Sequence, residues 1–165
     1  MDITSYEELD RNQCLNVFDS NTPRYFAPEE RAAFADFLES VPGPFWVIKD
    51  RESRTVLGCG GVTVADDGHT AWLRWGIVTG ASHRQGIGTH LLQARLEWIH
   101  NQPAIHLVRV STTGPALGFF ERMGFSVVST LPDGFGPGMT RYDLERSTED
   151  VHRIPKKLEG DSSRA

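Results

Sequence analysis

The sequence has few cysteines, and no pattern links them to a metal. Its 165 residues include only Cys14 and Cys59, which lie far apart from each other and from any histidine cluster. Neither a disulfide framework nor a zinc motif has that spacing. We therefore predict two free, buried thiols and no metal site.

The sequence also lacks long apolar runs and an excess of basic residues. No run approaches the roughly 20 apolar residues of a transmembrane helix, and the acidic start MDITSYEELD has no apolar signal region. The chain has 17 Lys and Arg against 22 Asp and Glu, a net charge of -5, whereas a general nucleic-acid surface is usually basic. We predict a cytoplasmic protein with no membrane or nucleic-acid partner, and we leave open whether it forms a homodimer.

What the chain does contain is the composition of a globular domain, with 39% hydrophobic and 24% charged residues. Its length suits one domain with a core of useful size. The last stretch, STEDVHRIPKKLEGDSSRA, is polar and has few apolar anchors. We predict a single domain over residues 1–145 and a polar, partly disordered tail over 146–165.

The first half of the chain predicts helices and then a meander of strands. Apolar residues recur at helical spacing over 6–20 and 28–41. Three β-rich runs follow, separated by short polar stretches typical of hairpin turns: FWVIKD, TVLGCGGVTVA and TAWLRWGIV. We expect these three strands to pair antiparallel.

The second half predicts a crossover. An amphipathic helix begins near residue 87, the strand IHLVRVST follows, and a helix then starts at Pro115 and ends before Gly124. Two closing strands complete the pattern. A strand, helix and strand in succession make a parallel pair, so we predict an α/β fold with a central mixed sheet flanked by helices. Arg95 falls inside the apolar arc of the first helix, and we expect it to snorkel to the surface.

Two glycines stand at a helix start in the stretch SHRQGIGTHLL, from Ser82 to Leu92. A dinucleotide fingerprint needs a third glycine where Leu91 stands, and a P-loop needs a lysine that is absent here. A loop whose backbone amides lead into a helix remains, and such a loop can bind a pyrophosphate. Structural punctuation by the glycines is the alternative.

The run from Val78 to Leu92 resembles the acetyl-CoA motif of GCN5-related N-acetyltransferases (GNAT), usually written Q/R-x-x-G-x-G/A. A second run, ALGFFERMGF from Ala116 to Phe125, resembles a later helix of that family, A-x-x-F-Y-E-x-x-G-F. The resemblance spans roughly residues 3–145. It implies the acyl-CoA N-acyltransferase fold, with a twisted mixed sheet that splays open at the acetyl-CoA site.

The resemblance implies a coenzyme site around this loop. The loop amides would hold the pyrophosphate, the strand end before the loop would pair with the pantetheine arm, and the thioester would enter the splayed sheet. The coenzyme-binding residues implied are Ile77, Val78, His83, Arg84, Gln85, Gly86, Ile87, Gly88, Thr89 and Phe119.

The chain departs from the family where proton transfer is usual. The tyrosine that often protonates the departing thiolate is replaced by Phe120, and the strand over 70–78 has no glutamate to act as base. The catalytic residues therefore stay unassigned. The candidates for the base are also ordinary surface residues by type: Glu29, Glu30, Asp66, Asp67, His69 and His83.

The acceptor side is suggested by aromatic and basic residues. Arg24, Tyr25 and Phe26 lie where the family often lines its acceptor site. Strand alternation places Arg74 with Trp72 on one face and Trp75 on the other, so Arg74 is a candidate for an acceptor carboxylate or for a cross-strand ion pair. The acidic balance of the chain weakly favours a cationic amine.

These features predict an acetyl-CoA-dependent N-acetyltransferase that acts on a primary amine of a small molecule or peptide by direct transfer in a ternary complex. Catalysis would then consist mainly of positioning the amine against the thioester. Two alternatives stay open. One is a coenzyme A-binding regulatory module that has lost turnover, and the other is a structural domain in which the glycines only shape the chain.

Overall fold

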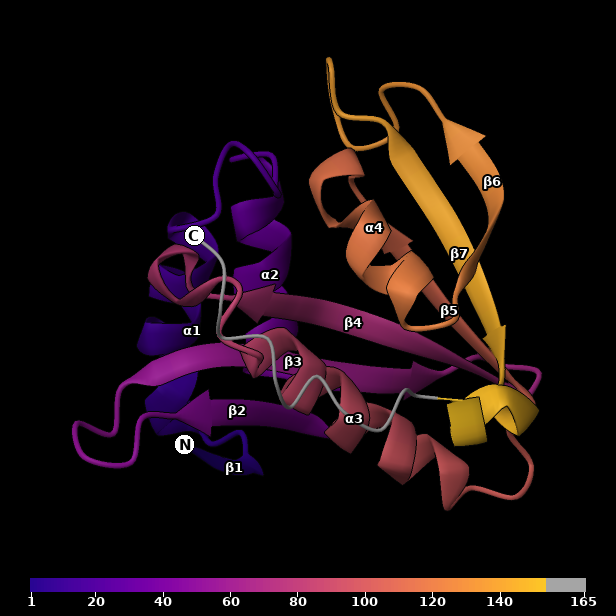
Figure 1. The fold of residues 1–165 in the computed structure, drawn as a ribbon. Helices are drawn as coiled ribbons and strands as arrows, with labels where there is room; N and C mark the ends of the chain where they lie inside the picture. Colours follow the sequence, from indigo (N-terminus) through magenta and orange to yellow (C-terminus); the bar gives the residue numbers. More distant parts are fainter. Residues whose placement is uncertain (154–165) are drawn as a thin grey trace, which may run out of the picture.

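A single mixed sheet organises the computed structural model, which describes residues 1–153 (Figure 1). Its seven strands lie in the order β1-β2-β3-β4-β5-β7-β6. The strands are β1 (Asp2–Ser5), β2 (Phe45–Lys49), β3 (Val56–Val64), β4 (Thr70–Val78), β5 (Leu107–Thr112), β6 (Ser126–Leu131) and β7 (Arg141–Ser147). The helices are α1 (Arg11–Asp19), α2 (Glu30–Glu39), α3 (Ile87–His100) and α4 (Gly114–Arg122). The predicted mixed sheet flanked by helices is confirmed.

The sheet is antiparallel everywhere except at one pair of strands. Strands β2 to β4 form the predicted antiparallel meander, and β1 extends it by pairing with β2. Strand β7 pairs antiparallel with both β5 and β6. The crossover through α3 makes β4 and β5 parallel, as predicted. Strand β1 was not predicted, because four residues that alternate between half-buried and exposed give only a weak signal.

The parallel pair is short, and this opens the sheet. Residues Thr70 to Trp72 pair with Leu107 to Arg109, and no further pairing joins the two strands. Past that point β4 and β5 fan apart, with α4 beside β5 and the first turn of α3 near the end of β4 (Figure 1). The predicted splay is therefore confirmed.

The two faces of the sheet carry separate cores. One core packs α3 and α4 against the sheet and includes Leu73, Leu96, Val108, Phe120 and Leu144. The other packs α1 and α2 against the opposite face and includes Cys14, Phe18, Phe34, Val47 and Cys59. Both cysteines are free and buried, as predicted. The two cores therefore cover opposite faces of the sheet.

A bulge interrupts the alternation of β4. The pairing passes from Cys59–Ile77 to Gly61–Arg74, which leaves Trp75 and Gly76 together opposite one residue of β3. Trp75 adopts a positive φ of 48°. Its ring packs against Phe34, with 4.9 Å between ring centroids, in the core under α1 and α2. The prediction that Trp75 faces away from Arg74 is wrong, because simple alternation takes no account of a bulge.

The predicted boundary at residue 145 falls inside β7. That strand continues to Ser147, and a 3₁₀ helix follows over Thr148–Arg153. Arg146 is buried and donates hydrogen bonds to the Met123 and Asp150 carbonyls. The folded part therefore extends beyond the predicted domain end, and the rest of the predicted tail, residues 154–165, lies outside the described residues. Over residues 1–153, no helix has the length and apolar character needed to cross a membrane.

Candidate functional site

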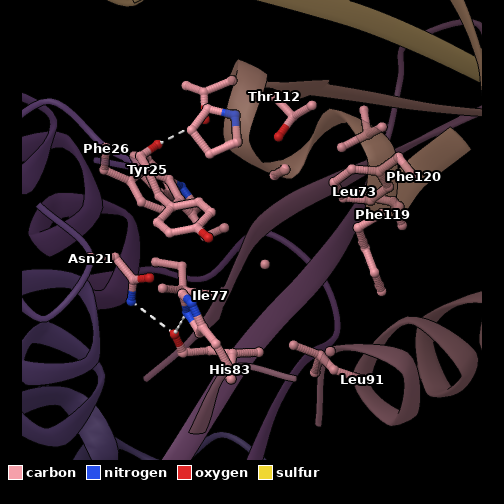
Figure 2. A pocket seen from close by; sticks show the side chains of 18 of the residues that line it. Asn21, Tyr25, Phe26, Leu73, Ile77, His83, Leu91, Thr112, Phe119 and Phe120 are labelled. Atoms are coloured by element: carbon pink, nitrogen blue, oxygen red, sulfur yellow. Dashed lines mark hydrogen bonds between the residues drawn. The ribbon is translucent and has the colours of Figure 1, made fainter. Parts of the chain in front are cut away.

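A cavity of about 1120 Å³ lies where β4 and β5 diverge. Its lining comes from the segment between α1 and α2, from β4, from the glycine loop and first turns of α3, and from β5, α4 and Arg141 of β7. Figure 2 shows Tyr25 and Phe26 on one side of the space and Leu73, Phe119 and Phe120 on the other. Its volume exceeds the range typical of small-ligand pockets, so it has room for two reactants.

The glycine loop opens into this cavity, and its two glycines serve different purposes. Gly86 stands immediately before α3 with a positive φ of 79°, a conformation that costs other residues free energy. Gly88 lies in the first turn, where an added Cβ would meet the Phe119 ring at 3.6 Å. Gly86 shapes the backbone, whereas Gly88 keeps the first turn of α3 narrow beside the cavity. The helix start thus presents free amides to an anion.

His83 and Asn21 fix the end of β4 beside this loop. The Val78 carbonyl accepts a hydrogen bond from Asn21 Nδ2 at 2.8 Å and from His83 Nε2 at 2.9 Å, both drawn in Figure 2. Asn21 is 4% exposed and also donates to the Val17 carbonyl. The His83 ring meets Tyr25 edge-on, with 4.9 Å between centroids. Asn21 was not among the predicted site residues, because an asparagine after a helix is a common turn residue.

Both phenylalanines of α4 line the cavity, and Phe120 also belongs to the core under α3 and α4. Phe120 is 8% exposed and packs edge-on against Phe125, and the position has no hydroxyl. Phe119 is half-buried and covers Gly88. Phe119 therefore contacts the cavity beside the glycine loop, as expected of a coenzyme-lining side chain.

The segment between α1 and α2 brings the predicted acceptor residues to the cavity. Arg24, Tyr25 and Phe26 all line it. The Tyr25 carbonyl accepts a hydrogen bond from Thr113 Oγ1 at 3.3 Å, which joins this segment to the start of α4. Phe26 packs on Phe18, so it belongs partly to the core. The Tyr25 hydroxyl points into the cavity (Figure 2).

The cavity lining is strongly basic. Glu30 is its single carboxylate among the described residues, whereas its basic members are Arg24, Arg74, His83, Arg84, Arg95, Arg122 and Arg141. Arg141 is neutralised by Asp143, with two contacts of 3.0 Å. Arg24 and Arg74 form no ion pair with any residue in 1–153. The cross-strand ion pair predicted as one option for Arg74 is therefore absent from this part of the chain.

Glu30 stands at the start of α2 and is half-buried. Its Oε2 accepts the Ala27 N–H at 2.8 Å. Burial raises the pKa of the Glu30 carboxyl, the Ala27 hydrogen bond opposes this change, and the neighbouring Glu29 charge raises the pKa further. Of the carboxylates predicted as bases, Glu29, Asp66 and Asp67 do not line the cavity.

The Arg95 side chain of α3 is buried, although it was predicted to reach the surface. The residue is 2% exposed and therefore does not snorkel. It lines the cavity from the α3 side of the sheet. Burial lowers the pKa of its guanidinium to about 10. A charged side chain in an apolar arc gives no sequence signal that separates snorkelling from complete burial.

The gap between β4 and β5 and the glycine-started helix α3 open into one cavity. The acetyltransferase (GNAT) family model matches residues 13–125, and the chain belongs to that family. The match confirms the resemblance found in the sequence. Sequence comparison with curated proteins finds no match.

Solved structures share the fold at low sequence identity. A protein assigned to the GNAT family from Desulfovibrio desulfuricans has a TM-score of 0.76 and 19% identity, over 89% of this chain and 98% of that one. An aminoglycoside 6'-N-acetyltransferase in complex with coenzyme A has a TM-score of 0.74 and 12% identity, over 90% and 97%. A protein assigned as a phosphinothricin N-acetyltransferase has a TM-score of 0.73 and 21% identity, over 89% and 98%.

Replacing Asn21 should weaken the anchor of β4. Asn21→Ala removes one hydrogen bond to the Val17 carbonyl and one of the two side-chain hydrogen bonds to the Val78 carbonyl, so we expect the free energy of unfolding to fall by about 1–3 kcal/mol. Urea denaturation measures this change. The exposed Asn12→Ala of α1 is the control and should change stability by less than about 0.5 kcal/mol. Equal effects of the two substitutions would contradict the anchoring role.

Proposed function

We propose that the protein transfers an acetyl group from acetyl-CoA to a primary amine within a ternary complex. One observation carries this proposal. The amides at the start of α3 and the gap between β4 and β5 open into the same cavity. An anion at the helix start and a chain inserted between the strands can therefore belong to one ligand.

The coenzyme fits the residues present on this side of the cavity. The amides from Gln85 to Thr89 would hold the pyrophosphate, with Arg84 supplying a positive charge. Phe119 would contact the pantetheine arm. The Val78 carbonyl is already occupied by Asn21 and His83, so Ile77 and the other edge groups of β4 would pair with that arm. His83 then acts by fixing the strand end.

The reaction forms a C–N bond between the amine and the acetyl carbon and breaks the C–S bond of the thioester. The amine must first lose a proton, because a free amine of the lysine type has a pKa near 10.4. We assign this proton to Glu30, the carboxylate of the cavity lining, whose raised pKa makes it a better base. The thiolate leaves without help from Phe120, since a thiol pKa near 8.5 makes it a tolerable leaving group.

The charges at the acceptor side favour an amine that also carries an anionic group, such as an amino acid. Arg24 and Arg74 line the cavity without carboxylate partners in the described chain. A guanidinium binds a carboxylate or phosphate through paired hydrogen bonds. The net negative charge of the whole chain had favoured a cationic amine. Charges act most strongly at close range, so the basic cavity lining is the better guide to the acceptor.

A second candidate, a coenzyme A-binding module without turnover, is favoured by one observation. Phe120 is buried, and β4 carries no carboxylate, so both usual proton-transfer groups are missing. Release of free thiol decides between the candidates. We would incubate the purified protein with acetyl-CoA and either amino acids, polyamines or peptides. We expect thiol release above the background rate with amino acids, and tight binding without release would support the module.

Gly88→Ala should weaken coenzyme binding without unfolding the protein. The added methyl finds ordinary contacts with Phe119 and Val78, but it stands beside the amides that would hold the pyrophosphate. We expect affinity for coenzyme A to fall by about tenfold, or 1.4 kcal/mol, in calorimetry. Gly114→Ala adds the same methyl at the start of α4, outside the cavity lining, and should keep the affinity. A parent protein with no affinity would contradict the coenzyme site.

Glu30→Gln should lower kcat rather than raise KM. The glutamine carbonyl can still accept the Ala27 N–H, so stability should change little, while the base is lost. We expect kcat to fall by about 10² to 10⁴. The acidic limb of the kcat/KM profile in the parent should also lie above the ordinary glutamate range, because the pKa of Glu30 is raised. Glu29→Gln is the neighbouring control, and an equal loss in both variants would argue against Glu30.

A further inference from the structure

The guanidinium of Arg95 lies in the cavity wall, where α3 packs against β3 and β4. Its Nε donates to the Leu91 carbonyl at 3.3 Å, one turn earlier in the helix. The rest of the guanidinium lies over Gly60 and Gly76. Arg95 is therefore a buried cation in contact with the β4 bulge.

The two glycines leave room for this group. A Cβ on Gly76 would lie 2.9 Å from both Nη atoms of Arg95, and a Cβ on Gly60 would lie 3.2 Å from Nη1. A Cβ contact of 2.9 Å is shorter than real side chains make, so any larger residue at Gly76 would displace the guanidinium, whereas the contact at Gly60 would be tight. Two strands therefore lack side chains at the point where Arg95 lies, so its guanidinium packs against their backbones.

The charge of Arg95 is not balanced by the described chain. Over residues 1–153 no carboxylate pairs with it, and its hydrogen bond to Leu91 uses only Nε. The Cys59 thiol is neutral, because its hydrogen bond with Cys14 and its burial raise its pKa. Even with a pKa of about 10, Arg95 stays protonated at neutral pH. A buried cation without a partner is costly, so an anion from outside the chain would complete the site.

The position of Arg95 identifies which reactant brings that anion. Arg95 lies about two turns along α3 from the glycine loop, and Leu91 lines the cavity between them. This is the donor side of the cavity. Arg24 lies in the segment between α1 and α2, and Arg74 lies in β4. These two arginines remain available to bind the acceptor.

We propose that Arg95 binds a carboxylate at the end of the donor's acyl chain, so that the preferred donor is a short dicarboxylic acyl-CoA, of the malonyl or succinyl type. The inference rests on the proposed transfer reaction and changes only the acyl group. The same C–N bond forms and the same C–S bond breaks, while the terminal carboxylate stays on the product. A carboxylate matches the guanidinium in charge and in paired hydrogen bonds, whereas an acetyl group offers only a neutral carbonyl.

The test compares donors in the parent, Arg95→Met and Arg95→Lys. We would measure kcat/KM with succinyl-CoA, malonyl-CoA and acetyl-CoA, and the affinity for each donor by calorimetry. We expect the parent to prefer a dicarboxylic donor, and Arg95→Met to reduce that preference by about 10- to 100-fold in both measurements. Gln93→Met, on the exposed side of α3, is the matched control and should keep the preference.

The variants separate donor recognition from folding. Arg95→Met replaces an unpaired buried charge with an apolar chain of similar length, so its melting temperature should equal or exceed that of the parent. Arg95→Lys keeps the positive charge but loses the paired N–H donors of the planar guanidinium. Its preference for dicarboxylic donors should therefore also fall. If Arg95→Met does not fold, the lysine variant decides the question.

Two results would overturn the inference. One is a parent that binds and uses acetyl-CoA as well as the dicarboxylic donors. The other is a donor preference that the Arg95 substitutions leave unchanged. If no donor is turned over with any amine, the proposed transfer fails, but calorimetry still tests Arg95 alone. Tighter binding of succinyl-CoA or malonyl-CoA that is lost in Arg95→Met would then uphold the recognition of the carboxylate.

Discussion

The pairing between β4 and β5 ends after Trp72 and Arg109, and the cavity depends on that end. A sheet normally satisfies the backbone groups of both strands along their length. Here the crossover helix α3 and the helix α4 cover the two diverging strands, so the gap stays open without collapse of the core. The rigid cores on both faces keep the opening in place, and loops and helix starts supply its polar groups.

The sequence predicted the elements that carry strong local signals. The glycine loop before α3, Pro115 at the start of α4 and the β-rich runs each depend on residues close together in the chain. The family resemblance also predicted that the sheet would open, as it does between β4 and β5. The edge strand β1 and the bulge at Trp75 were missed, because both depend on pairing with residues elsewhere in the sheet.

The candidate site was predicted only in part for the same reason. The glycine loop is continuous in sequence, so its residues can be named from the sequence alone. Glu30 was one of several equivalent carboxylates until the fold brought it to the cavity and left Asp66 and Asp67 outside. Arg95 was recognised as unusual, but its burial depends on two glycines from other strands, Gly60 and Gly76.

Gly60, Gly76 and Arg95 occupy one volume, and this links three positions that are distant in the chain. A side chain on Gly76 requires the guanidinium to move, whereas a short residue at position 95, such as alanine, would leave a hollow beside both glycines. The effects of substitutions at these three positions on the free energy of unfolding should therefore not be additive. A relative that replaces the arginine with a short side chain can keep a well-packed wall only by enlarging a glycine as well, so the three residues would then diverge as a unit rather than one at a time.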